Sequence, residues 1–126
     1  GKPLAHTIAD AADHTVSVPL THAVATRVLS ELELDILIYA DTLSEPISHF
    51  LSHARLATVQ VAFWGNPITS GSRQIDYFVS SVGMEHPYRC RMRYQGQSIS
   101  TNDDPYTEQV VMLEGQGIWY YPPISV

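Results

Sequence analysis

The apolar residues of this chain recur with two different spacings. A spacing of three to four residues, which is typical of an amphipathic helix, occurs over 3–12, in the stretch after Thr21 and in the stretch after Pro46. Thr21 is a suitable N-cap for the second of these helices, and proline is accepted in the first turn of the third. The pattern therefore predicts three short helices in the first half of the chain.

Short apolar runs alternate with these helices and predict strands. The run over 34–40 (LDILIYA) is almost unbroken, which is the pattern of a strand covered on both faces, as parallel sheets require. Further strands are predicted over 14–18, 58–64, 75–80 and 110–113. Because helices and strands alternate with short connections, the sequence predicts an α/β fold, a parallel Rossmann-like sheet with flanking helices.

Length and composition indicate how the chain is organised. Its 126 residues, 44% of them hydrophobic, fit one globular α/β domain over 1–126. The segment 84–104 breaks the pattern, because it is polar and rich in turn formers, and we interpret it as an exposed excursion. The chain begins at Gly1 and stops after an apolar stretch, so both ends are expected to be cut from a longer protein. We interpret the basic residues of the excursion as a solvated surface rather than an anion site: Arg89, Arg91 and Arg93.

Charge and cysteine content argue against several kinds of partner. The net charge is -6 with only seven lysines and arginines, which leaves little basic surface, so no nucleic-acid partner is predicted. The single cysteine, Cys90, cannot form an internal disulfide or a thiolate metal site, and it favours a reducing, cytoplasmic location. No apolar run reaches the roughly 18–20 residues of a membrane span, so no membrane partner is predicted either.

The richest candidate site is the loop that leaves the strand predicted over 58–64. Ligands gather at the carboxyl ends of parallel strands, so the position of this loop indicates binding. Its glycines allow close backbone approach, its proline stiffens the turn, and its amide and hydroxyl side chains suit a sugar better than a phosphate. The predicted substrate-binding residues are Trp64, Gly65, Asn66, Pro67, Thr69, Ser70 and Gly71. The alternative is a tight connection whose polar side chains satisfy local backbone groups.

A series of motifs runs in a fixed order between Leu34 and Pro123. It consists of the strand LDILIYA, then Ala54-Arg55-Leu56-Ala57, then VQVAFWGNPITSG followed by Ile75-Asp76-Tyr77-Phe78, and finally Tyr106-Thr107-Glu108-Gln109. The series resembles glycosyltransferase family 41, the protein O-GlcNAc transferases and SPINDLY-like proteins. The resemblance implies a GT-B architecture, in which two Rossmann-like lobes face each other across a cleft. This chain would supply part of the N-terminal lobe.

The resemblance also implies roles for residues and partners. Trp64, Gly65 and Pro67 match residues that line the sugar and acceptor side of the cleft, and the Thr-Ser-Gly that follows matches the motif shaping that turn. The donor, a nucleotide-sugar such as UDP-GlcNAc, would be a co-substrate held mainly by the C-terminal half, and no other cofactor is implied. The chain is therefore expected to be inactive alone, to pair with that missing half and a protein or other acceptor, and to self-associate when isolated. No catalytic residue is assignable. Asn66 and Ile68 depart from the best-known members, so the donor sugar and acceptor stay open.

Other polar residues carry weaker signals. His49 and His53 lie four residues apart on a predicted helix, but no third ligand accompanies them, so no metal site is predicted. Asp76 is interpreted as fixing the neighbouring loop through backbone hydrogen bonds. Ser70 lacks the G-x-S-x-G elbow of hydrolases. The aromatic segment 119–123 is expected to pack against the missing half.

Two alternatives come from other functional classes. Asn66 and the arginine-rich excursion favour a noncatalytic α/β interaction or scaffold domain that kept the sheet and lost the cleft. A free-standing nucleotide-binding domain is disfavoured, because no G-x-G-x-x-G or P-loop follows any predicted strand.

Overall fold

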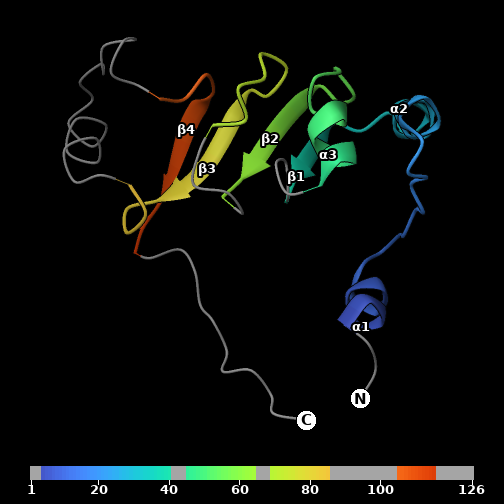
Figure 1. Cartoon of the computed structure of the whole chain (residues 1–126). Helices are drawn as coiled ribbons and strands as arrows, with labels where there is room; N and C mark the ends of the chain where they lie inside the picture. Colours follow the sequence, from blue (N-terminus) through green and yellow to red (C-terminus); the bar gives the residue numbers. More distant parts are fainter. Residues whose placement is uncertain (1–3, 41–44, 65–68, 86–104, 116–126) are drawn as a thin grey trace.

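The structure, a computed structural model, describes residues 4–40, 45–64, 69–85 and 105–115. Its elements are, in chain order, α1 (Leu4–Ala11), α2 (His22–Glu31), β1 (Ile36–Tyr39), α3 (Pro46–Leu51), β2 (Val59–Phe63), β3 (Tyr77–Ser81) and β4 (Gln109–Leu113). The strands form one parallel four-stranded sheet in the order β1-β2-β3-β4 (Figure 1). The predicted α/β fold with a parallel, Rossmann-like sheet and flanking helices is confirmed.

The helices begin close to where the apolar spacing predicts them. Thr21 is the N-cap of α2 and Glu45 that of α3, both with extended backbone and neither with a side-chain capping bond. Pro46 stands in the first turn of α3, where its missing N–H costs no helical hydrogen bond. Among the described residues, no helix is both long and apolar enough to cross a bilayer.

The strand register shows which residues share each face of the sheet. Tyr39, Ala62, Phe78 and Val110 stand opposite one another across the four strands and so share one face. The same face carries the core cluster, which α3 and α2 cover. The buried members of that cluster are Ala25, Tyr39, Leu51, Leu56, Ala62, Ile75 and Phe78.

Tyr39 joins β1 to the helix that follows it. Its hydroxyl donates to the carbonyl oxygen of Leu51, the last residue of α3, at 3.2 Å. Burial raises the pKa of Tyr39 to about 12, because ionisation would place a phenolate in the core. The hydroxyl therefore serves the packing of α3 on the sheet.

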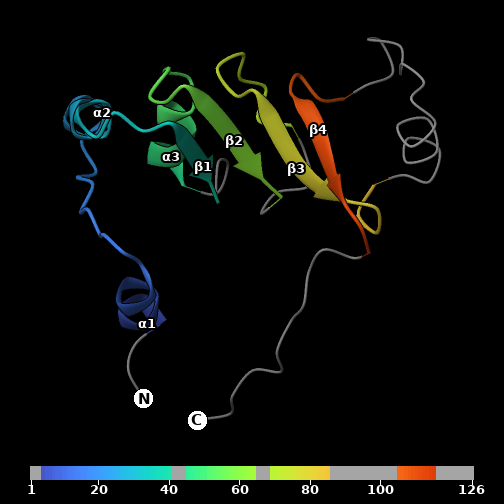
Figure 2. The same cartoon turned by 180° about the vertical axis from the view of Figure 1, so that it is seen from behind.

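The opposite face of the sheet is exposed at its two edge strands, β1 and β4 (Figure 2), whereas on the central strands Val61 is 9% and Ser81 0% exposed. Ile36 and Ile38 of β1 are each 59% exposed, and Val111 and Leu113 of β4 are 40% and 41% exposed. The sequence predicts that the strand over 34–40 is covered on both faces, and in the described ranges this is wrong for β1. The reason is topological, because α2 and α3 both pack on the side that carries Tyr39.

The segment between α1 and α2 also differs from the prediction. Residues 14–18, predicted as a strand, belong to no strand and are exposed throughout. An alternating apolar pattern suits a strand, but a strand forms only beside a partner, and none of the four described strands pairs with it. The excursion predicted over 84–104 lies outside the described residues from residue 86 onward.

Candidate functional site

Trp64 lies at the edge of the sheet where α/β proteins bind ligands. It directly follows Phe63, the last residue of β2, and so marks the carboxyl end of a parallel strand. Its side chain is half-buried, and its ring centroid lies 4.6 Å from that of Phe63. Three other predicted site residues, Gly65, Asn66 and Pro67, lie outside the described residues.

Thr69, Ser70 and Gly71 lie at the opposite edge of the sheet. The backbone N–H and the hydroxyl of Ser70 both donate to Oε1 of Glu108, the former at 2.8 Å, and the Thr69 hydroxyl donates to Oε2 at 2.6 Å. Glu108 directly precedes β4, so these contacts are made at the amino ends of the strands (Figure 1). The structure therefore separates Trp64 from the second half of the predicted loop.

Glu108 is a buried carboxylate, with 6% of its surface exposed. Burial alone raises its pKa, but the hydrogen bonds from the hydroxyls of Ser70 and Thr69 and from the Ser70 amide outweigh burial and hold the pKa below its usual value. The carboxylate is therefore charged at neutral pH and fixes the β2–β3 connection against the start of β4.

The same connection satisfies its own backbone through short polar side chains. The Thr69 hydroxyl accepts from the Gly71 N–H at 3.0 Å, and the Ser70 hydroxyl accepts from the Ser72 N–H at 3.2 Å. Gly71 has φ +68°, a left-handed conformation that glycine adopts without strain. The described part of the loop thus has the contacts expected of a tight connection, with the hydroxyls of Thr69 and Ser70 engaged within the chain.

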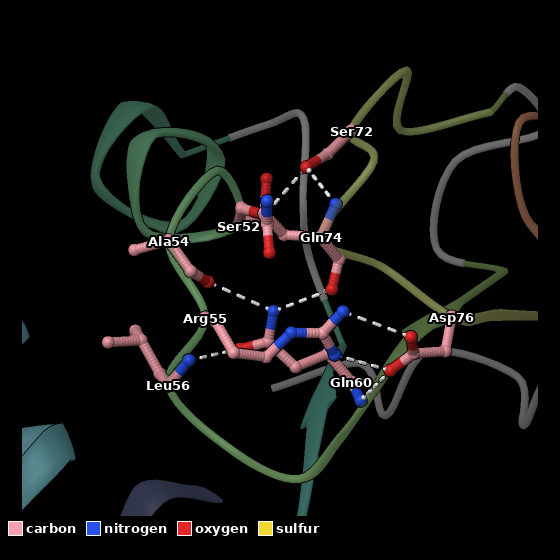
Figure 3. Close-up of polar contacts among 8 residues, drawn as sticks. All are labelled: Ser52, Ala54, Arg55, Leu56, Gln60, Ser72, Gln74 and Asp76. Carbon is pink, nitrogen blue, oxygen red and sulfur yellow. Dashed lines mark hydrogen bonds and ion pairs between the residues drawn. The ribbon is translucent and has the colours of Figure 1, made fainter.

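Gln60 is the centre of a second polar network, shown in Figure 3. Its side chain, 0% exposed, belongs to the second residue of β2 and lies on the covered face. Oε1 accepts from the Leu56 N–H at 2.9 Å, and Nε2 donates to the carbonyl oxygens of Ala54 at 3.0 Å and Gln74 at 2.8 Å. One amide therefore joins the segment after α3 to the end of the β2–β3 connection.

Asp76 continues this network toward solvent. Its Oδ2 accepts from the Gln60 backbone N–H at 2.8 Å, and its two oxygens accept from the Arg55 guanidinium at 2.6 and 3.1 Å (Figure 3). The hydrogen bond from Arg55 has the larger effect in lowering the pKa of Asp76, and the hydrogen bond from the Gln60 N–H lowers it further. Asp76 is predicted to fix its neighbouring loop through backbone hydrogen bonds; its carboxylate accepts one such bond, from Gln60 of β2, and its other contacts are with Arg55.

A further buried carboxylate, Glu85, lies after the carboxyl end of β3 and is 8% exposed. Its Oε1 accepts from the Ser80 hydroxyl at 2.7 Å and from the Tyr106 hydroxyl at 2.6 Å. The Tyr106 ring packs on Phe78 with centroids 4.7 Å apart, so this trio lies over the covered face of β3. Its residues come from segments 21 positions apart, and sequence reasoning did not single out Glu85.

His49 of α3 and His53, which lies two residues beyond the end of α3, form no metal site with any other described residue. The rings of His49 and His53 meet edge to face with centroids 4.9 Å apart. In the parts of the chain that the structure describes, no group of three His, Cys, Asp or Glu side chains is placed to hold a metal ion. His49 also packs against Phe50, whose ring centroid lies 5.8 Å from its own.

Comparison with protein-family models, with curated proteins and with solved structures finds no match. The parallel α/β fold thus comes from the structure, while the functional reading depends on the residues themselves.

Proposed function

We propose that this chain is part of the N-terminal lobe of a GT-B glycosyltransferase resembling the protein O-GlcNAc transferases. In this proposal the carboxyl edge of the sheet lines the sugar and acceptor side of a cleft. A second lobe binds the nucleotide-sugar donor, and catalysis depends on positioning and charge stabilisation between the lobes. A cytoplasmic setting belongs to the same proposal and rests on the single cysteine.

One observation carries the proposal, namely the half-buried tryptophan at the carboxyl end of a central parallel strand. Trp64 directly follows β2, which pairs with β1 on one side and β3 on the other. An aromatic ring at this position can stack on a sugar face, and central strands of α/β sheets direct the residues after them toward the ligand crevice. The motifs on either side of Trp64 also keep the order found in family 41.

The test is a transfer assay with UDP-GlcNAc on the chain alone and on a longer chain that includes the downstream half. We expect transfer only from the longer chain. In that chain, Trp64→Ala should lower kcat/KM by at least about tenfold, which corresponds to about 1.4 kcal/mol of lost transition-state stabilisation.

The matched control is Phe50→Ala, which removes a 58% exposed aromatic ring from α3. It should leave kcat/KM unchanged. Transfer by the 126-residue chain alone would refute the division of labour, and equal losses from both variants would refute the role of Trp64.

A second candidate is a noncatalytic scaffold domain, and the contacts of Glu108 favour it. The hydroxyls of Thr69 and Ser70, which the sequence assigns to a sugar, both donate to this carboxylate. Under this alternative the longer chain binds no nucleotide-sugar. Calorimetric titration with UDP-GlcNAc separates the two, because saturable binding by the longer chain contradicts the scaffold function.

A further inference from the structure

We draw no further inference here: the strongest candidate, the buried carboxylate of Glu85 with the Ser80 and Tyr106 hydroxyls on the covered face of β3, is accounted for by the hydrogen bonds that join the end of β3 to the segment before β4, and nothing in the described residues indicates a ligand that it would bind.

Discussion

Gln60 is the residue whose removal tests the architecture most directly. It is the second residue of an otherwise apolar strand, fully buried, and its amide makes three hydrogen bonds to backbone groups of Ala54, Leu56 and Gln74. Gln60→Leu keeps the approximate volume and removes all three. Leu56 is itself buried, so its N–H is left without water as a replacement partner.

The magnitude follows from the cost of unsatisfied buried groups. Each costs about 1–3 kcal/mol, and the carbonyls of Ala54 and Gln74 belong to half-buried residues that recover part of this from water. We therefore expect Gln60→Leu to lower the free energy of unfolding by about 3–5 kcal/mol. The free energy of unfolding of a domain is about 5–15 kcal/mol in total, so this loss is a large part of it. With a urea dependence of about 2 kcal/mol/M, the urea midpoint should fall by about 2 M.

The assay is urea unfolding followed by circular dichroism, with Gln109→Leu as the matched control. Gln109 is an exposed glutamine at the start of β4, and its replacement should change the free energy of unfolding by no more than about 0.5 kcal/mol. A loss below about 1 kcal/mol for Gln60→Leu would refute the reasoning, because it would mean that the three backbone groups need no partner.

Gln60→Glu refines this test through pH. The new carboxylate would face two carbonyl oxygens in a buried site, which raises its pKa above the unfolded value of about 4.3. A raised pKa gives stability that is present below the unfolded pKa and is lost as the pH rises. The variant should therefore be closest to wild type near pH 4 and should fall further behind toward pH 7.

Three further predictions concern titratable groups. Burial raises the pKa of Tyr39 to about 12. The stability that the protonated Tyr39 contributes is therefore present below about pH 10 and is lost between about pH 10 and 12. In Tyr39→Phe, the free energy of unfolding should fall less steeply over this pH range than in wild type. Glu108→Gln should cost about 1–3 kcal/mol at pH 7, and because the pKa of Glu108 is depressed, the difference from wild type should shrink below about pH 4 in acid titration of the unfolding midpoint. In urea unfolding, Arg55→Met should lower the midpoint less than Asp76→Ala, because Asp76 also accepts the Gln60 N–H and the Arg55 ion pair is screened by solvent; equal losses would contradict this ranking.

The local pattern of apolar residues is enough to predict several helices and strands of this fold. The apolar run at β1, the proline that opens α3 and the short run at β2 each act over a few residues, and each of these elements forms where the sequence indicates. The strand predicted over 14–18 does not form, because strand formation needs more than a local pattern. Its alternation is local, but strand formation depends on a partner that local pattern cannot supply.

The polar contacts of the candidate site were predictable only in part. We did not single out Gln60 from the sequence, although a glutamine within an apolar strand has to find hydrogen-bond partners and could have been noticed for that reason. Glu108 gives no such signal, since it acts on Ser70 from 38 positions away. Such pairings depend on how the strands are ordered, and they appear only once β3 and β4 lie side by side.

The β2–β3 connection brings these observations together. A chain that links neighbouring parallel strands must return from the carboxyl to the amino edge, and most proteins do this with a helix whose apolar face packs on the sheet. Here the described end of the connection, 69–76, contains no helix, and polar bonds hold it instead: Ser70 to Glu108, Ser72 to the Ser52 carbonyl, and Gln74 to Gln60. At the amino edge of the sheet, these polar side chains therefore make hydrogen bonds within the chain. The ligand site that we propose lies at the carboxyl edge, next to Trp64, so substitutions at the two edges should separate effects on stability from effects on binding.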